Sequence, residues 1–222
     1  MKIKTKSYFS QALMALLSLL FLITSVNLLQ NIGGGTTDLS ENSIAQAPTN
    51  TTYWIDETTQ TALSVDFDNY TLTQDTSAST TTYLIQSEKD LAFLSWTIYN
   101  DQVYGGSDNK YTSRSGNYFY PGITFKQTKD LNLSAYYWQP IGISYTRTGT
   151  SASRYFSGNY DGGGYTVSGV FTPAGSGNGY SNQGLFGRVY GRSSTQQASI
   201  ANLGVIDSFV QGDSWLGGVV GD

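Results

Sequence analysis

Carboxylates are the first side chains to examine for chemistry, because this 222-residue chain contains no cysteine and no histidine. Thiol nucleophiles, Ser-His-Asp triads and zinc sites of the usual ligand types are therefore excluded. Asp56, Glu57, Asp66 and Asp68 could supply the oxygen ligands that calcium prefers. No segment has the spacing of an EF-hand calcium loop, so a solvated turn is the better interpretation. We predict no metal site and no cofactor.

A second group of carboxylates could serve acid–base catalysis. Some proteins with a parallel β-helix cleave polysaccharides, and such enzymes need two or three carboxylates clustered on one face. The candidates are Asp130, Asp161, Asp207 and Asp213, but each belongs to a different motif. Asp161 stands in a glycine-rich corner and Asp207 follows an apolar strand, so turn and capping roles are the simpler interpretation. We predict no catalytic residues. A carbohydrate-active β-helix enzyme, or the binding module of one, stays open as the alternative to a non-enzymatic protein.

Aromatic side chains could form a binding surface. The candidates are Tyr136, Tyr137, Trp138, Tyr145, Tyr155, Tyr160, Tyr165 and Tyr180. Such rings can stack against sugars or pack on a protein partner. Tyrosine is also common in strands because it suits a half-buried pleated face, so both interpretations stay open. The partners expected under the first are glycans or proteins of a host or cell surface.

The composition favours an extended β protein. Charged residues make up 13% of the chain, against 25 glycines and 17 tyrosines. A disordered chain would be rich in charge and poor in aromatic residues. Lys2, Lys4 and Lys6 are the only charges before Asp38, and beyond them 9 basic residues face 16 acidic ones, a net charge of −7. An acidic body of this kind excludes nucleic acid as a partner.

The first 32 residues have the pattern of an export signal. Three lysines precede an apolar run over residues 12–29, as in the charged and apolar regions of a signal peptide. This placement keeps Met1 on the cytoplasmic side and sends the rest across the membrane. No small-x-small cleavage site follows closely, so a cleaved signal and a retained membrane anchor both stay open. We expect a secreted or cell-surface protein that touches a membrane only through this segment.

The remaining sequence divides into residues 33–82 and residues 83–222. The first part is a polar linker with a short irregular β segment, in which Leu63, Val65 and Phe67 alternate as in a strand. The second begins with a short strand and a helix over residues 87–98, with Ser87 as its N-cap. Leu91, Leu94 and Ile98 fall on one face of that helix. We expect the helix to cover the open edge of the first strand layer.

Glycine motifs recur through the last third of the chain. Gly184-Leu-Phe-Gly187 and Gly218-Val-Val-Gly221 overlap after a shift of 34 positions, and a fixed shift of this size indicates a stacked repeat. Asp161-Gly-Gly-Gly164 suits a sharp corner between strands. The expected apolar spine is Leu185, Phe186, Val189, Ile200, Leu203, Val205 and Val210. At roughly 20–35 residues per turn, the repeat gives about four to six turns.

The order of these motifs resembles the GLUG-motif repeat proteins of bacterial cell surfaces. It runs from the capped helix through Asp130-Leu-Asn-Leu and Trp138-Gln-Pro-Ile-Gly142 to Phe156-Ser-Gly-Asn-Tyr-Asp-Gly-Gly-Gly. Gly184-Leu-Phe-Gly187, Ile200-Ala-Asn-Leu-Gly-Val205 and Gly218-Val-Val-Gly221 then follow. The resemblance covers residues 83–222.

The resemblance implies an all-β protein, a right-handed parallel β-helix (β-solenoid) with one N-terminal capping helix. It also implies a non-enzymatic stalk or adhesive module with no catalytic set. The sequence stops at Asp222 directly after a repeat motif, without the polar closing unit that repeat arrays normally carry. We expect either a fragment of a longer protein or an exposed, adhesive last turn.

Overall fold

The computed structural model describes residues 48, 53–55, 67–104, 114–147, 150–174 and 180–222. These residues belong to one compact unit, Ser43–Asp222. The expected signal or anchor over residues 1–32 lies outside the described residues, as do Leu63 and Val65. No helix in the described part combines the length and apolar character needed to cross a membrane.

The described part is rich in strands and contains one α-helix, which confirms the β-rich class. A short 3-10 helix, η1 (Phe67–Asn69), stands where the sequence predicted the end of a strand. The remaining elements are β1 (Thr82–Ile85), α2 (Glu88–Tyr104), β2 (Arg114–Ser115), β3 (Tyr118–Phe119), β4 (Thr124–Gln127), β5 (Leu131–Asn132), β6 (Ile143–Arg147), β7 (Thr150–Phe156), β8 (Asn159–Asp161), β9 (Thr166–Ser168), β10 (Ser181–Gln183), β11 (Ser199–Ala201), β12 (Gly204–Ile206) and β13 (Ser214–Leu216).

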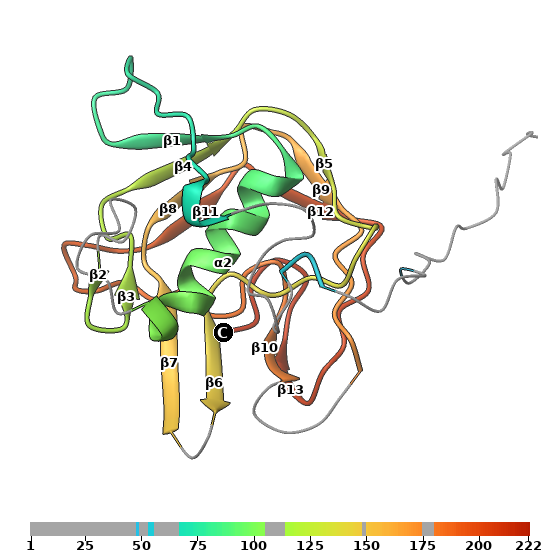
Figure 1. Ribbon diagram of the computed structural model, residues 1–222. Coiled ribbons are helices and arrows are strands. Elements are labelled where there is room, and N and C mark those ends of the chain that lie inside the picture. Colours follow the sequence, from blue (N-terminus) through green and yellow to red (C-terminus); the bar gives the residue numbers. More distant parts are fainter. Residues whose placement is uncertain (1–47, 49–52, 56–66, 105–113, 148–149, 175–179) are drawn as a thin grey trace, which may run out of the picture. The chain divides into compact units, whose positions relative to one another are not determined.

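Most strands pair in parallel with strands from distant parts of the chain. A four-stranded sheet has the order β1-β4-β8-β11, and all three of its pairings are parallel (Figure 1). A three-stranded parallel sheet has the order β5-β9-β12, and β10 pairs in parallel with β13. The order within each sheet follows the order along the chain, so each pass of the chain lies beside the previous one.

Two antiparallel pairs interrupt this arrangement. β2 pairs with β3, and β6 pairs with β7 in a hairpin that connects residues 143–156. No pattern in the sequence predicted this hairpin. It is local, because β7 returns at its end to a parallel pairing with β3. The parallel sheets therefore remain the main arrangement, and the described strands do not form a sandwich of two antiparallel sheets.

The distance along the chain between paired residues lies near the upper end of the expected 20–35 at some pairs and exceeds it at others. Phe156 pairs with Val189, an offset of 33, and Phe186 pairs with Val220, an offset of 34. The second value confirms the shift that superimposes the two glycine motifs. Thr82 pairs with Thr124 at an offset of 42 because α2 is inserted between them. Ile141 pairs with Phe186 at an offset of 45 because the β6–β7 hairpin is inserted there.

The core contains aromatic and aliphatic side chains aligned across paired strands. Phe125 lies between Tyr83 and Tyr160 in register, and Phe125 and Tyr160 are buried. Of the expected spine, Leu185 and Phe186 are fully buried. The later members are only partly buried: Val189, Ile200, Leu203, Val205 and Val210. The last four of these belong to the pass that contains β11 and β12, whose pairing partners lie on one side only.

Helix α2 begins as the sequence predicts. The Ser87 hydroxyl accepts a hydrogen bond from the Asp90 N–H at 3.2 Å, which is the N-cap interaction. The Asp90 carboxylate accepts the Gln86 N–H at 2.8 Å and the Tyr70 hydroxyl at 2.7 Å. The helix runs on to Tyr104, well past the expected end at Ile98.

The structure corrects the expected role of α2. Residues 90–98 are buried without interruption, so the helix has no solvent-facing side there. Phe67 packs against Phe93 and Trp96, with ring centroids 5.4 Å apart in both pairs. Ile55, Phe67 and Leu72, from the stretch assigned to a linker with irregular β structure, all belong to the core. The helix is thus enclosed between this N-terminal segment and the strands.

The free edge of β1 is covered by residues 73–75 rather than by the helix. Leu84 donates its N–H to the Thr73 carbonyl at 2.8 Å, and Asp75 donates to the Thr82 carbonyl at 2.9 Å. The physical reason is that a strand edge needs backbone partners, whereas the backbone groups inside a helix are already paired. The expected covering of the edge exists, but an extended segment provides it.

The Tyr70 hydroxyl gives an alkaline pH dependence that can be tested. Burial, followed by the hydrogen bond to Asp90, raises the pKa of Tyr70 from 10.0 to about 12. A raised folded-state pKa contributes stability that is complete below pH 10 and lost as the pH rises towards 12. We expect the unfolding free energy of the wild type to fall more steeply across this window than that of Tyr70→Phe in urea titrations. Parallel slopes for the two proteins would contradict this assignment.

Candidate binding site

The carboxylates considered for catalysis have structural partners instead of one another. Asp130 accepts the Thr166 N–H at 2.8 Å and the Thr166 hydroxyl at 3.0 Å. Asp161 accepts the Asn202 side-chain amide at 2.9 Å and the Gly163 N–H at 3.0 Å. These bonds, that to Asn202 first, hold the pKa of Asp161 below its usual value. Both residues therefore fix corners between strands.

The other acidic candidates do not form a cluster that could hold a metal. Asp207 has a left-handed backbone with φ of 45°, and its carbonyl accepts the Gly169 N–H at 3.1 Å. Asp213 is exposed directly before β13. Within the described ranges, no three acidic side chains gather into a possible metal site. Asp56, Glu57 and Asp66 lie outside the described residues, and the Asp68 side chain is not described.

The expected aromatic surface is divided between interior and exterior. Trp138 is fully buried and donates its indole N–H to the Leu185 carbonyl at 2.9 Å. Tyr160 is also buried and donates its hydroxyl to Gln127 Oε1 at 3.0 Å; burial raises the pKa of this phenol. Tyr136, Tyr137, Tyr155 and Tyr180 are half-buried, and Tyr165 is exposed. The Tyr145 side chain lies outside the described residues.

Three tyrosines from successive passes of the chain stand next to one another. We call Tyr118, Tyr155 and Tyr190 the tyrosine ladder. The ring centroids of Tyr118 and Tyr155 are 5.4 Å apart, and those of Tyr155 and Tyr190 are 5.3 Å apart. The ladder follows from strand alternation: because Phe119 and Phe156 point into the core, the preceding tyrosines in β3 and β7 point outward. Tyr118 and Tyr155 are half-buried, and Tyr190 is 57% exposed.

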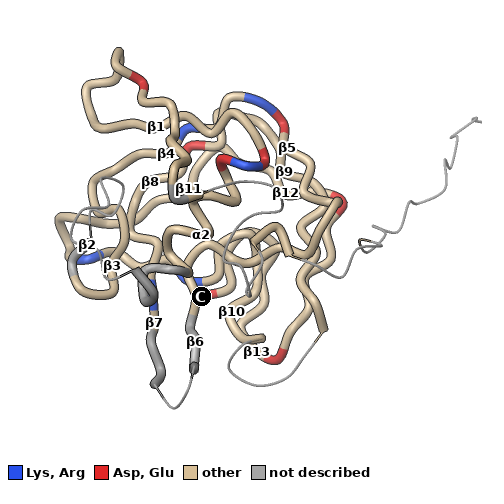
Figure 2. The backbone as a smooth tube through the Cα atoms, viewed as in Figure 1, with Lys and Arg blue, Asp and Glu red and all other residues tan. Residues whose placement is uncertain are grey.

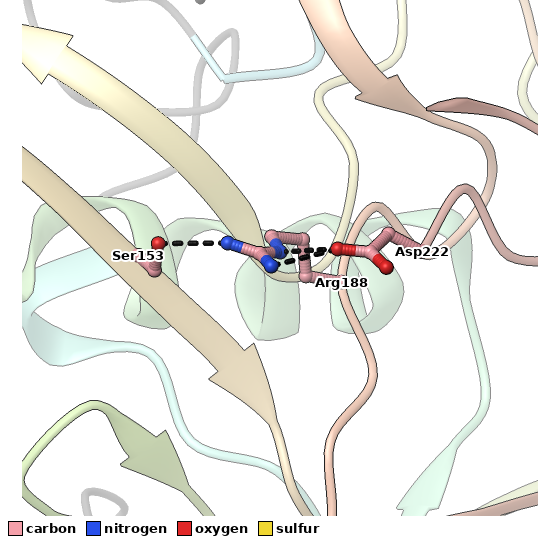
Figure 3. A network of polar contacts seen from close by, with 3 residues as sticks. All are labelled: Ser153, Arg188 and Asp222. Atoms are coloured by element: carbon pink, nitrogen blue, oxygen red, sulfur yellow. Dashed lines mark hydrogen bonds and ion pairs between the residues drawn. The ribbon is translucent and has the colours of Figure 1, made fainter. Parts of the chain in front are cut away.

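An arginine is fixed over the middle ring of the ladder. The Arg188 guanidinium carbon lies 4.8 Å from the centre of the Tyr155 ring. Arg188 Nη1 donates to Ser153 Oγ at 2.7 Å, and Nε donates to Asp222 Oδ2 at 2.8 Å (Figure 3). Nη2 lies 2.7 Å from the same Asp222 oxygen. The Arg188 guanidinium group is thus held by Ser153 on one side and by Asp222 on the other.

The geometry suits recognition of a neutral polar ligand. Tyrosine rings offer an apolar face and a hydroxyl that donates and accepts. Asp222 compensates the charge of Arg188, so the site has no net charge. Since the rest of the body is acidic, a negatively charged ligand is disfavoured. The ladder with Arg188 is the part of the described surface that best combines aromatic faces with fixed hydrogen-bonding groups.

Tyr118, Tyr190 and Arg188 were not among the binding residues predicted from the sequence. The signal was available as spacing, because Tyr118 and Tyr155 are 37 residues apart and Tyr155 and Tyr190 are 35 apart. These spacings can be recognised as a repeat only when the strand register is known, because inserted elements change the spacing between paired residues from one pass of the chain to the next. No protein-family model, curated protein or solved structure matches this chain.

Proposed function

We propose that this chain is an exported cell-surface protein of the GLUG-motif type. In this proposal residues 83–222 form a right-handed parallel β-helix that serves as a stalk and adhesive module without catalysis. The observation that carries the proposal is the parallel register between successive passes of the chain, at offsets of 33–45 residues. Such a register builds a long surface of repeated side chains rather than a pocket.

The handedness rests on a general property of parallel strands. A connection between parallel strands of one sheet is right-handed in nearly all proteins, because twisted strands favour that return path. Three parallel sheets that share the same passes of the chain then form a right-handed coil. Export rests on the basic start and the apolar run over residues 12–29.

The ligand proposed for the adhesive face is a neutral glycan chain. The tyrosine ladder repeats a ring about every 5.3 Å along the strand-pairing direction, and a polymer can contact several rings at once. Each contact is weak, but contacts along one chain add to the total affinity. The hydroxyls of a sugar also match Arg188 and the tyrosine hydroxyls as hydrogen-bond partners.

Replacing the exposed end of the ladder tests this proposal. We expect Tyr190→Ala to weaken binding to an immobilised neutral polysaccharide by about tenfold, with an unchanged unfolding midpoint because the side chain is mostly exposed. Tyr165→Ala is the matched control, since Tyr165 is an exposed tyrosine outside the ladder. The measurement is a binding isotherm with each protein. Equal losses for both variants, or none for Tyr190→Ala, would refute the ladder as the binding face.

A further inference from the structure

The outward side chains of β3 and β7 form a column of polar groups that runs across the strands. Tyr118 and Tyr155 are register partners in this parallel pair. A parallel bridge between the following passes brings Arg188 opposite Tyr155. Tyr190 follows two residues further on, on the same outward side of the chain because side chains alternate along an extended segment. Successive passes thus each contribute one tyrosine to the column.

The step between the rings of the tyrosine ladder is nearly constant. The ring centroids of Tyr118 and Tyr155 are 5.4 Å apart, and those of Tyr155 and Tyr190 are 5.3 Å apart. The backbone sets this step, because neighbouring strands lie about 4.8 Å apart. A polymer can contact every ring only if each of its units advances by about the same distance. The ladder therefore selects a polymeric ligand by its length per repeating unit.

The hydroxyls of the ladder are available to a ligand. In the part of the chain that the structure describes, none of the three ladder tyrosines uses its hydroxyl in a hydrogen bond, whereas Tyr70, Tyr120 and Tyr160 donate theirs to other side chains. A tyrosine hydroxyl both donates and accepts. Such groups, repeated at a regular step, suit a ligand that repeats its own hydroxyls in the same way.

The charge around the ladder favours a neutral polymer. Asp222 compensates Arg188, whose Nη2 lies 2.7 Å from the carboxylate. β3 contains no charged residue, and Arg154 of β7 is buried. Figure 2 shows lysines and acidic residues gathered instead near β1, β4 and β5. The acidic body would repel a polyanion, and the carboxylate beside the ladder that could attract a polycation is already paired.

We propose that the tyrosine ladder binds an extended, neutral β-1,4-linked glycan, with one sugar for each tyrosine. This inference rests on the glycan-binding function proposed above and names the linkage that fits the ladder. Pyranoses joined through equatorial bonds at C1 and C4 form a flat, straight chain. Each sugar advances that chain by almost the full length of its ring and bridging oxygen, which is close to the step of the ladder. The axial bond at C1 makes an α-1,4-linked chain coil, so its successive hydroxyls turn away from the ladder.

Hexasaccharides that differ in linkage test this proposal. Cellohexaose and maltohexaose are matched neutral probes, because both are glucose chains and only the configuration of the linkage differs. Mannohexaose and chitohexaose, both β-1,4-linked, present the extended linkage with other sugars. We expect the tightest of the extended probes to bind the full chain at least about tenfold more tightly than maltohexaose in calorimetric titrations. Equal affinities, or no binding by any extended probe, would overturn the proposal.

Removal of single hydroxyls tests the match between sugars and rings. Tyr118→Phe and Tyr155→Phe should each weaken binding of the tightest extended probe by roughly threefold to tenfold, because each variant removes one hydrogen bond. Tyr165→Phe is the matched control, since Tyr165 is an exposed tyrosine outside the ladder. Unfolding midpoints of all three variants check that the fold is intact. Unchanged affinity in both ladder variants would count against the proposal.

The outcomes separate this inference from the glycan-binding function on which it rests. If maltohexaose binds as tightly as the extended probes and Tyr190→Ala weakens all of them, the ladder binds glycans without selecting their linkage. The proposed function then stands and this inference is wrong. If neither the hexasaccharides nor the immobilised polysaccharide binds, the glycan-binding function fails and this inference fails with it.

Discussion

Gly142→Ala should lower the unfolding free energy by about 4 kcal/mol. Gly142 has a φ of +81°, and a Cβ there would lie 2.3 Å from the backbone oxygen of Arg188. Left-handed strain accounts for about 1–2 kcal/mol of the loss. The rest arises because Arg188 donates its N–H to the Gly142 carbonyl at 3.0 Å, so the two passes of the chain would have to separate. The measurement is urea unfolding followed by circular dichroism.

Gly164→Ala separates the two causes. Gly164 has nearly the same backbone angle, φ +84°, but a Cβ there meets nothing within 4 Å. Only the left-handed strain applies, so we expect a loss of about 1–2 kcal/mol. The difference between the two variants then measures how tightly successive passes of the chain pack. Equal losses for Gly142→Ala and Gly164→Ala would show that the close approach at Gly142 does not exist.

Phe171→Ala should lower the unfolding free energy by about 3–5 kcal/mol, the usual cost of removing a buried phenylalanine ring. Phe171 is 2% exposed and pairs in register with Phe209. On its other side the Trp138 backbone N–H donates to the Phe171 carbonyl at 2.7 Å. Phe209→Ala should lower the stability by less than about 1 kcal/mol, because that ring is already half exposed. Both variants remove the same side chain from neighbouring layers.

This pair also tests whether the Phe209 ring is exposed in solution, as it is in the structure. A large loss for Phe209→Ala at low protein concentration would mean that another layer covers it, for example a second copy. Repeating the measurement over a range of protein concentrations distinguishes these cases, since association makes the stability concentration-dependent. A concentration-independent, large loss at position 209 would contradict the exposed position of this ring.

The sequence predicted the features that depend on local pattern. The short strand before the helix, the cap at Ser87 and the corner at Asp161-Gly-Gly-Gly164 are all present, the corner with left-handed backbones at Gly163 and Gly164. The 34-residue shift reappears as the pairing of Phe186 with Val220. These predictions were right because strand periodicity, helix capping and turn formation depend on only a few neighbouring residues.

The features that the sequence did not predict depend on contacts between distant segments. Arg154 is buried because it shares the inward face of β7 with Phe156, and it donates Nη1 to the Ile98 carbonyl at 3.0 Å and to the Tyr99 carbonyl. Those acceptors belong to a helix 55 residues earlier in the chain. Likewise, Phe67 packs on α2 although the intervening sequence is polar. No local sequence pattern predicts which distant segment Arg154 or Phe67 will contact.

Disulfide formation between Ser181→Cys and Ser214→Cys tests the parallel stack most directly. The two hydroxyl oxygens lie 2.9 Å apart on paired strands of successive passes, and neighbouring strands have the separation that a disulfide requires. Because the chain has no cysteine of its own, a single crosslink is unambiguous by peptide mass mapping. We predict complete intramolecular linkage of residues 181 and 214 after mild oxidation. Two free thiols, or linkage only between molecules, would contradict the parallel arrangement.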